Sequence, residues 1–395
     1  MRLLHTSDWH LGRSLHRADL RTAQSRFLDH LVDTVRSERV DLVLVSGDVY
    51  DRAVPPVDAV ALCEDALHRL RSAGARVVLI SGNHDSARRL GFGSALFDVA
   101  GVHLRTSAAG CAVPVLCEDE HGPVAVYGIP YLEPAAVRSA LGLAGDAGHA
   151  GVMRHAVAAV TADADARGVA RRVVLSHSWV AGGAGSESER DICLGGAGQV
   201  PLAVFDGFSY VALGHLHGRQ VLAPAIRYSG SPLPYSFSEA AHRKGSWLVS
   251  LDGSGSVRAD LVEAPVYRRL RAVTGVMAEL LTSPRYAEYE GDFLAVTLTD
   301  QVRPEGGMDA LRMRFPHILV LSHEPAGVVP DGRDYRARVV GRDDLDIAAE
   351  FVLHVRGAAA TDGELALLTS AFSAALTAAT TAGDCSAGDC SAGDC

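Results

Sequence analysis

Residues 79–86 read LISGNHDS, in which an apolar run is followed directly by Gly82, Asn83, His84 and Asp85. A tight turn needs glycine and accepts asparagine, but it has no need of a histidine beside an aspartate. Asparagine, histidine and aspartate side chains bind metal ions, and the last two also transfer protons. The stretch therefore indicates a reactive site at the end of a buried strand, unless it is a polar turn with incidental side chains.

Four further apolar runs are followed by residues of the same kind. Each run has the length of a strand and is bounded by polar or turn residues, which is typical of a buried strand. In chain order, the five runs are followed by SDWH, SGDVYD, SGNHD, SHS and GHLHG, with the candidate ligands Asp8, His10, Asp48, Asn83, His177, His215 and His217. In open α/β sheets, ligands bind beyond the carboxyl ends of the strands. We therefore expect these side chains to meet at one edge of the protein.

These candidate ligands offer oxygen and nitrogen atoms and include no cysteine. Such a set favours manganese, iron or magnesium over a structural zinc ion. It is too large for one ion that keeps positions open, whereas two ions that share one carboxylate would use it fully. Paired metals about 3.5–4 Å apart clamp the attacking and leaving oxygens of a displacement at phosphorus, and they acidify a bound water. The residues thus suit a two-metal site that acts on phosphate esters.

The elements that position these residues alternate between strands and helices. Apolar residues recur every three or four positions in Phe27–Val35 and in Val60–Leu70, and Gly74 follows the second stripe as a C-cap. This alternation predicts an α/β layered domain over residues 1–265. We expect the strand-like pattern of residues 206–263 to form a second sheet that completes it. The five apolar runs are Leu3–Leu4, Leu42–Val45, Val77–Ile80, Val173–Leu175 and Val211–Leu213.

Residues 266–340 predict a smaller α+β domain, which the resemblance described below implies to be a cap domain. Its expected elements are helices at Gly275–Leu281 and Met308–Phe315 and strands at Phe293–Leu298 and Ile318–Leu321.

Residues 341–380 predict two C-terminal helices. The second helix should begin at a capping box, Thr361–Glu364, and it carries an apolar stripe of Leu365, Leu368, Phe372 and Leu376. Residues 381–395 consist largely of GDC repeats, which are too short to bury a core and are expected to be disordered. The alternative is that the thiolates of these repeats bind metal.

Composition limits what the protein can be. The chain has 395 residues, which predicts two domains, and its hydrophobic content of 48% is that of a globular protein. No apolar segment could span a bilayer and the N-terminus lacks the apolar region of a signal peptide, so we expect a cytoplasmic protein that does not contact a membrane. The net charge of -10 gives no support for nucleic-acid binding. A local basic groove can nevertheless lie on an acidic protein.

Cysteine and lysine usage adds two observations. Cys63, Cys111, Cys117 and Cys193 show no CxxC spacing, so we expect reduced packing thiols instead of a zinc finger or a thioredoxin-type motif. Lys244 is the only lysine in a chain with 37 lysines and arginines. We attribute this imbalance to the base composition of the genome.

The five motifs, in their order, resemble the signature of the calcineurin-like metallophosphoesterases. The signature is Asp-x-His, Gly-Asp-x-x-Asp, Gly-Asn-His-Asp, an isolated His after a strand, and Gly-His-x-His. The chain is more closely similar to the SbcD family of bacterial double-strand-break-repair nucleases, over residues 1–375. The similar stretches are HTSDWHLGR (5–13), VSGDVYDRAVPP (45–56), SGNHDS (81–86), SHSWV (176–180), GHLHG (214–218), YSGSPLPYSFSE (228–239) and LRMRFPHIL (311–319). The resemblance implies a two-sheet sandwich flanked by helices, followed by a cap domain.

The resemblance also implies a role for each matched residue. One divalent ion would be held by Asp8, His10, Asp48 and His217, and the other by Asp48, Asn83, His177 and His215, with Asp48 bridging. His84 would not bind metal but would stabilise the transition state or protonate the leaving oxygen, and Asp51 would orient it. The implied metal is manganese and the implied substrates are DNA ends and hairpins. The implied partner is an SbcC-like coiled-coil ATPase, in a heterotetramer that contains a homodimer of this chain.

Three functions stay open at this point. They are a manganese-dependent DNA nuclease of repair, recombination and replication, a small-molecule or cyclic-nucleotide metallophosphoesterase, and a non-catalytic scaffold. The complete ligand set opposes the scaffold, and residues 267–375 exceed what a small-molecule phosphatase needs. Five arginines past the ligand motifs would contact DNA phosphates, or are ordinary solvated side chains: Arg13, Arg17, Arg52, Arg88 and Arg89. The stripe on the last helix would dock on the ATPase, or packs on the cap.

Overall fold

The structure is a computed structural model that describes residues 1–143, 145, 147–190, 192, 198–325, 341–356 and 358–383, without the side chains after 375. It divides into two compact units, Met1–Leu270 and Arg271–Cys395. The predicted end of the first domain, residue 265, lies close to this division. Four features named above lie outside the described residues: the predicted boundary at residue 340, Cys193, the side chain of Leu376 and the GDC repeats from residue 384.

Two six-stranded sheets form the centre of the described part of the first unit. The first has the order β14-β13-β1-β4-β5-β6, and its strands are β1 (Arg2–Thr6), β4 (Leu42–Ser46), β5 (Arg76–Ile80), β6 (Val102–Arg105), β13 (Gly245–Leu251) and β14 (Val257–Glu263). The second has the order β11-β12-β10-β9-β8-β7, and its strands are β7 (Val115–Asp119), β8 (Gly122–Ile129), β9 (Arg171–His177), β10 (Tyr210–Gly214), β11 (Gln220–Ala223) and β12 (Ile226–Tyr228). The strands that precede the five motifs pair in parallel, β1 with β4 and β4 with β5 in the first sheet, and β9 with β10 in the second.

The strands that carry the motifs are buried on both faces. In β4 every residue is buried, and successive side chains point to opposite sides. Leu42 and Leu44 join the core between the two sheets, whereas Val43 and Val45 join the core beneath the helices. A run of apolar residues without polar alternation is therefore the pattern that this strand requires.

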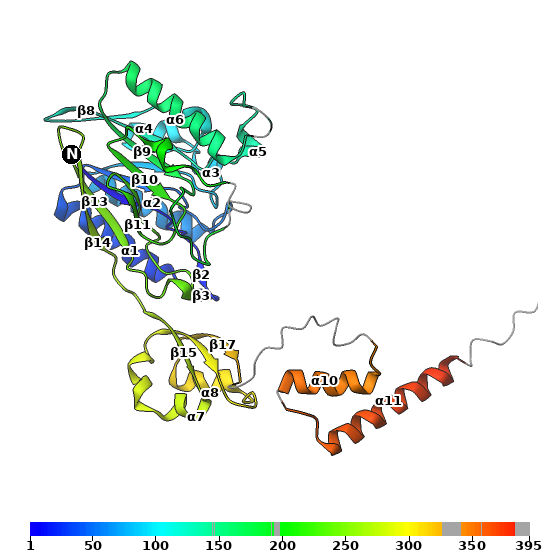
Figure 1. The fold of residues 1–395 in the computed structure, drawn as a ribbon. Coiled ribbons are helices and arrows are strands. Elements are labelled where there is room, and N and C mark those ends of the chain that lie inside the picture. Colours follow the sequence, from blue (N-terminus) through cyan, green and yellow to red (C-terminus); the bar gives the residue numbers. More distant parts are fainter. Residues whose placement is uncertain are drawn as a thin grey trace, which may run out of the picture. The chain divides into compact units, whose positions relative to one another are not determined.

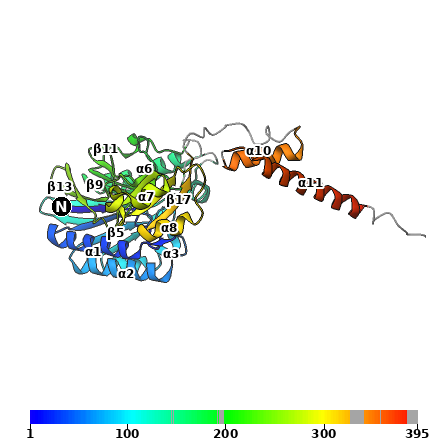
Figure 2. The same ribbon diagram turned by 90° about the horizontal axis from the view of Figure 1, so that it is seen from below.

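Three long helices cover the outer faces of the sandwich, and they are α1 (Arg21–Glu38), α2 (Val57–Ser72) and α6 (His149–Ala166). Helices α1 and α2 pack on the first sheet, and α6 packs on the second (Figure 1, Figure 2). The predicted stripes in Phe27–Val35 and Val60–Leu70 provide most of the buried residues of α1 and α2. The shorter elements of this unit are β2 (Ser14–Leu15), β3 (Ala18–Asp19), α3 (Ala87–Leu90), α4 (Ser94–Val99), α5 (Pro134–Val137), η1 (Ala108–Gly110), η3 (Leu202–Phe205) and η4 (Phe237–Glu239).

The predicted α/β class and the two-sheet sandwich are confirmed, but one assignment within the sandwich was wrong. Residues 206–263 do not form a sheet of their own. Strands β11 and β12 extend the second sheet, whereas β13 and β14 lie at the edge of the first, where Leu4 of β1 pairs with Leu248. The reason is that β13 completes a sheet begun at the N-terminus, a pairing that no local pattern shows.

The second unit contains a small α+β fold. Its sheet has the order β15-β16-β17, and its elements are β15 (Leu270–Gly275), α7 (Met277–Thr282), η5 (Pro284–Tyr289), β16 (Phe293–Leu298), α8 (Gly307–Arg314) and β17 (Ile318–His323). Leu280, Leu294, Leu311 and Phe315 belong to its core. The four predicted elements are present, and β15 is an additional strand.

Helices α10 (Asp344–Arg356) and α11 (Asp362–Gly383) follow. The predicted capping box is formed, because the main-chain N of Thr361 donates to Glu364 Oε2 at 2.7 Å and the N of Glu364 donates to Thr361 Oγ1 at 3.4 Å. Arg356 of α10 forms an ion pair with the same glutamate. None of the described side chains of the two helices is fully buried. No described helix is both long and apolar enough to cross a membrane.

Candidate metal centre

Both sheets deliver candidate ligands to one edge of the sandwich. The first sheet supplies four of them after β1, β4 and β5, and the second supplies three at the ends of β9 and β10: Asp8, His10, Asp48 and Asn83, then His177, His215 and His217. The edges meet at Ser46, whose Oγ donates to the main-chain O of Ala212 at 2.9 Å. The main-chain O of Ser46 lies 2.9 Å from His177 Nδ1. The structure thus brings the seven predicted ligands together.

Four of these residues have an unusual backbone. The φ angles are 53° for Asp8, 46° for His10, 48° for Asp48 and 108° for His215. Residues other than glycine rarely adopt such positive φ angles. Such a conformation costs about 1–3 kcal/mol per residue and is typical of functional sites. Gly82 shows how closely the loops approach, because a Cβ there would lie 2.1 Å from Asp48 Oδ1. The backbone around the cluster therefore adopts a conformation that brings the ligands together and lowers the stability of the fold.

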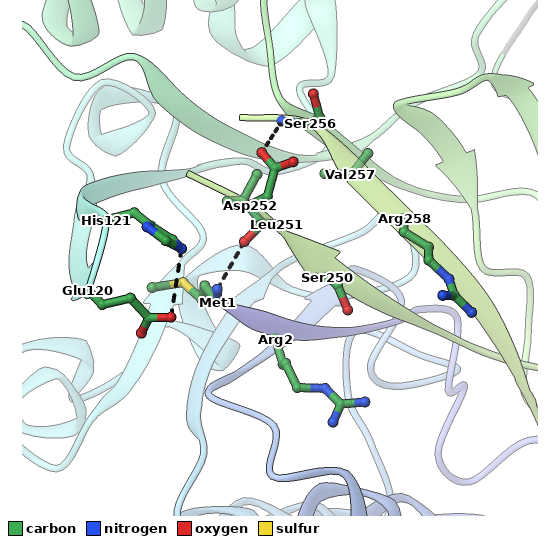
Figure 3. Close-up of a pocket in the computed structure, with 10 residues that line it drawn as sticks. All are labelled: Met1, Arg2, Glu120, His121, Ser250, Leu251, Asp252, Ser256, Val257 and Arg258. Atoms are coloured by element: carbon green, nitrogen blue, oxygen red, sulfur yellow. Dashed lines mark hydrogen bonds and ion pairs between the residues drawn. The ribbon is translucent and has the colours of Figure 1, made fainter. Parts of the chain in front are cut away.

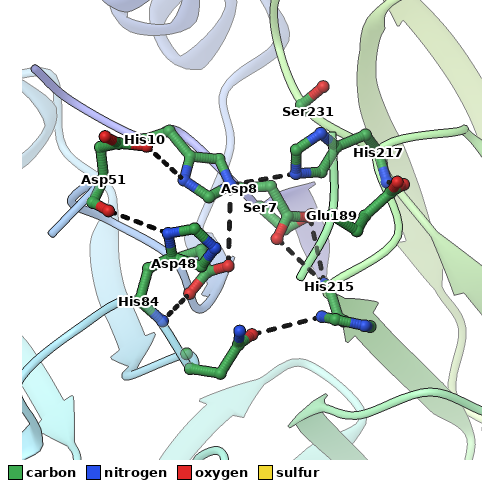
Figure 4. A network of polar contacts seen from close by, with 12 residues as sticks. Ser7, Asp8, His10, Asp48, Asp51, His84, Glu189, His215, His217 and Ser231 are labelled. Carbon is green, nitrogen blue, oxygen red and sulfur yellow. Dashed lines mark hydrogen bonds and ion pairs between the residues drawn. The ribbon is translucent and has the colours of Figure 1, made fainter. Parts of the chain in front are cut away.

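The first group of ligands lies around His10. Ligand atoms of Asp8, His10 and His217 all lie within 4.8 Å of one another. Nε2 of His10 is 3.0 Å from Nε2 of His217 and 3.6 Å from Oδ2 of Asp48 (Figure 4). These atoms converge on one point, as the ligands of a shared ion do.

The second group lies on the other side of Asp48. Oδ2 of Asp48 is 3.5 Å from Nε2 of His177. The side-chain oxygen of Asn83 is 2.9 Å from the same nitrogen and 3.3 Å from Nδ1 of His215. Asp48 therefore borders both groups, which is the position that the sequence predicts for a bridging ligand.

Burial sets the charges of these side chains. It lowers the pKa of His177 to about 4 and holds those of His10 and His215 well below the usual value, so the imidazoles are neutral at pH 7. Burial also raises the pKa of Asp48 to about 6, and burial together with the charge of Asp48 raises the pKa of Asp8. Neutral imidazoles offer lone pairs, and no lysine or arginine of the described residues forms an ion pair with the two neighbouring buried carboxylates.

These residues fit a pair of divalent cations. The atoms that face one another in the two groups are imidazole nitrogens, carboxylate oxygens and the amide oxygen of Asn83. A divalent cation would supply the positive charge that Asp8 and Asp48 lack, and oxygen and imidazole donors suit manganese, iron or magnesium.

His84 lies beside the first group. Its main-chain N donates to Asp48 Oδ1 at 2.9 Å, and its Nδ1 lies 2.9 Å from the main-chain O of Asp51. Because a carbonyl oxygen only accepts, Nδ1 carries a proton and Nε2 is left for a substrate. A ligand atom of His84 also lies within 4.8 Å of one each from His10 and Asp48. Its place therefore allows the predicted proton transfer and also lies within reach of an ion in the first group.

Asp51 contacts His84 through a different group from the one predicted. The sequence suggested that the Asp51 carboxylate orients the histidine, whereas the structure shows the main-chain oxygen in that position. The carboxylate instead lies 3.7 Å from His10 Nδ1 and 3.7 Å from Arg13 Nε.

Sequence reasoning gave Asp85 no role, although it completes the motif. Its carboxylate accepts hydrogen bonds from the main-chain N of Gly82, Val49 and Tyr50 at 2.9, 3.1 and 2.9 Å. It therefore ties the loop after β5 to the loop after β4. The position after His84 in the motif was the only signal that could have identified it.

A further group around His217 was missed altogether. Glu189 Oε1 accepts a hydrogen bond from the main-chain N of His217 at 2.6 Å, and Glu239 and Ser188 contact its Nδ1. Burial opposes ionisation of Glu239, but its bond to His217 and the charge of Lys244 lower its pKa below the usual value. Burial lowers the pKa of Lys244, and Glu239 partly offsets this. Two features of the sequence pointed to this group: Glu239 ends the similar stretch YSGSPLPYSFSE (228–239), and Lys244 is the sole lysine.

Three of the five predicted arginines, Arg13, Arg52 and Arg89, contact the loop that contains Asp51. Arg52 Nε is 3.6 Å from Asp51 Oδ2, and Arg89 donates to the main-chain O of Ala53. Arg13 is largely buried and donates to the O of Ser188. The side chains of Arg17, Arg52, Arg88 and Arg89 are exposed. Arg190, which was not predicted, is exposed as well, and its charge acts on Asp48 and His84.

A separate pocket of about 430 Å³ lies at the other end of β1, around Met1, Arg2 and Arg258 (Figure 3). The Met1 ammonium there donates to the main-chain O of Leu251 at 2.9 Å and pairs with Asp119 at 3.0 Å. Because β1 runs away from this pocket towards Asp8, we assign it no part in the chemistry of the metal centre.

A buried two-metal ligand set at the strand ends of a two-sheet sandwich defines a metal-dependent phosphoesterase. The chain belongs to the calcineurin-like phosphoesterase family, whose model matches residues 1–219 and so includes all seven candidate ligands, His84 and Asp51.

Three solved structures are similar to this chain. They are the calcineurin-like phosphoesterase YfkN from Bacillus subtilis (13% identity, TM-score 0.35, 67% of this chain and 89% of that one), GAP50, the anchor in the inner membrane complex of Plasmodium (10%, 0.40, 67% and 84%), and a dimetal phosphatase from Danio rerio (15%, 0.37, 63% and 92%).

Proposed function

We propose that this phosphoesterase is a DNA nuclease that hydrolyses phosphodiester bonds, as an exonuclease on duplex ends and as an endonuclease on hairpins or single strands. The observation that supports a nucleic-acid substrate is the set of guanidinium groups around one loop of the metal centre. Arg13 and Arg52 approach the Asp51 carboxylate, Arg89 bonds to Ala53, and the charge of Arg190 acts on Asp48. On a chain with a net charge of -10, such a grouping suits a substrate with phosphates on both sides of the scissile one.

Bound divalent ions, for which we propose manganese, would supply an acidified water and stabilise charge at phosphorus. The chain itself would hold the scissile phosphate near His84. The bond to the main-chain O of Asp51 fixes the ring so that Nε2 faces away from that carbonyl. In the imidazolium form, which carries a proton on each ring nitrogen, Nε2 can give its proton to the leaving sugar oxygen or donate a hydrogen bond to the transition state. An alkoxide is a poor leaving group, so a diester gains much from this proton.

The test is a cleavage assay with manganese that compares labelled duplex and hairpin DNA with nitrophenyl phosphate. The Asp48→Asn variant, prepared in parallel, is the control for contaminating nucleases because it lacks the shared carboxylate. We expect DNA cleavage by the parent and none by the variant. Hydrolysis of nitrophenyl phosphate or a cyclic nucleotide without DNA cleavage would establish the small-molecule phosphoesterase instead.

We propose further that α11 binds an SbcC-like coiled-coil ATPase. Its stripe residues Leu365, Leu368 and Phe372 are only half-buried, and Leu367 beside them is 72% exposed. Two helices without a buried residue gain stability by covering such a face. Replacing both Leu368 and Phe372 by Asp should abolish co-purification with the ATPase and the stimulation of DNA cleavage by ATP. Cleavage by the chain alone should persist. Unchanged binding, or loss of cleavage by the chain alone, would show that the stripe packs within this chain.

We also propose a homodimer in the cytoplasm, with a second copy covering exposed apolar side chains of the α3–α4 segment. Phe92, Leu96 and Val99 there are 83%, 79% and 90% exposed. Light scattering should report a dimer for the parent and a monomer for Leu96→Asp. Val302→Asp, at another exposed valine, is the matched control and should stay dimeric. A monomeric parent would refute the proposal.

A further inference from the structure

The only lysine of the chain lies against the metal centre. Its side chain is 8% exposed, and Nζ donates to the main-chain O of His217 at 2.9 Å, to Ser231 Oγ at 2.9 Å and to Glu239 Oε2. An ammonium group has three donors, and each of them finds an acceptor here. The lysine is therefore fully satisfied in a closed polar pocket.

A lysine suits this pocket better than the arginine that the chain uses everywhere else. The three acceptors surround one nitrogen atom, which a compact ammonium can serve. A guanidinium is planar, spreads its donors over a wider fork and needs more room. Genomic base composition explains the excess of arginine but does not explain why the one exception stands here.

Glu239 connects this lysine to a ligand. The residue is buried, and its Oε1 lies 3.4 Å from His217 Nδ1, while Oε2 faces Lys244. Ser188 Oγ contacts both Glu239 Oε1 and His217 Nδ1. The opposite ring nitrogen, Nε2, is the atom that lies 3.0 Å from His10 Nε2. One side of the imidazole thus faces acceptors and the other faces the predicted ion.

We propose that Glu239 and Lys244 are a positioning pair for the ligand His217. The carboxylate, directly and through Ser188, keeps the proton on Nδ1, so that Nε2 presents its lone pair to a divalent cation. Lys244 holds the carboxylate in place and neutralises it, and the same ammonium fixes the backbone of His217. The inference rests on the two-metal site of the proposed function but not on a DNA substrate.

The consequence is confined to one of the two ions. His217 belongs to the group around His10, whereas His177, Asn83 and His215 form the group on the other side of Asp48. Nδ1 of His177 lies against the main-chain O of Ser46, so its orientation does not depend on Glu239. Weakening the pair should therefore weaken one ion and spare the other.

The experiment is a calorimetric titration of metal-free protein with Mn²⁺, for the parent and for Glu239→Gln, Lys244→Met and Lys244→Arg. Loss of such a partner of a ligand typically lowers metal affinity about 10–100-fold. We expect a loss of this size for one ion in Glu239→Gln and Lys244→Met, and a smaller loss in Lys244→Arg. In a parallel titration with Co²⁺, the visible spectrum of the ion at the His217 group should differ between these variants and the parent. The arginine variant keeps the charge, so it remains informative if the other two do not fold.

Arg171→Met is the matched control for the loss of a buried ion pair. Arg171 is 4% exposed and pairs with Asp119 at 2.6 Å, and it begins β9 whereas His177 ends it, about 20 Å away. This variant should lose thermal stability and keep the parent's affinity for both ions. If Glu239→Gln and the lysine variants behave in the same way, the pair only supports the loops and the inference fails. Absence of DNA cleavage by the parent would refute the proposed substrate but leave this result readable.

Discussion

Replacing Asp48 by Asn should make the metal-free protein more stable at neutral pH. Asp48 is buried, its Oδ1 accepts the main-chain N–H of His84, and its Oδ2 faces two imidazoles. Burial raises its pKa from 3.8 to about 6. Asparagine has the same shape and can accept the same hydrogen bond, but it carries no charge that burial penalises.

The sign and size follow from linkage between proton binding and folding. A raised carboxyl pKa means that the folded state binds this proton more tightly than the unfolded state does, so stability is lost as the pH rises from about 4 to about 6. Each pKa unit corresponds to about 1.4 kcal/mol, so the loss is about 3 kcal/mol and persists above pH 6. Buried histidines such as His177 have lowered pKa values and give the opposite trend. They are present in both proteins and largely cancel in the difference.

The assay is urea denaturation in a chelator between pH 4.5 and 7.5. The free energy of unfolding of Asp48→Asn, minus that of the parent, should rise by about 2 kcal/mol across this range, because about a third of the total loss falls below pH 4.5. Asp119→Asn is the control for the sign of the stability change. Because the hydrogen bond from Arg171 lowers the pKa of Asp119, removal of this carboxylate should destabilise the protein at neutral pH. With saturating Mn²⁺ the order should reverse, since ligand binding stabilises only the folded state that binds it. A difference that does not depend on pH would refute an unfavourable charge on Asp48.

Three further predictions concern the same site. His84→Ala should retain two ions by metal analysis and lower cleavage about 100-fold or more, and loss of one ion would instead make His84 a ligand. Asp51→Ala should lower the turnover number less than about 10-fold, because its main-chain oxygen still holds His84, and a loss as large as that of His84→Ala would show that the carboxylate itself acts. Gly82→Ala should lower Mn²⁺ affinity by displacing Asp48, whereas Gly363→Ala, where a Cβ meets nothing within 4 Å, should not, and equal affinities would contradict the close approach.

The strands before the motifs could be predicted because each is buried on both faces and reads as a continuous apolar run. The edge strands could not, because their patterns are mixed: β7 alternates buried and exposed residues, and β14 has half-buried and exposed residues but none that is fully buried. The position of β13 depends on Leu4 pairing with Leu248, a contact between residues far apart in sequence. Local patterns therefore predict elements well and sheet membership poorly.

The candidate ligands could be found for a related reason. Asp8, Asp48 and His177 directly follow or end strands, and metal chemistry restricts the residue types at those positions. Glu239 ends η4 and Lys244 directly precedes β13, and no strand-end motif marks their place beside His217. The bond from His84 to a main-chain oxygen could not be predicted, since every residue carries that oxygen.

The distribution of ligands implies that metal binding also holds the sandwich together. Four candidate ligands follow strands of the first sheet and three come from the second, so the ions would link the sheets at this edge. Without them, the edge contains two buried carboxylates that repel and four residues in an unfavourable backbone conformation. The opposite edge is fixed by Arg171, Asp119 and the Met1 ammonium, which need no metal. Removal of metal should therefore increase amide hydrogen exchange first in the loops after β1, β4 and β10, and least where Asp119 lies at the end of β7.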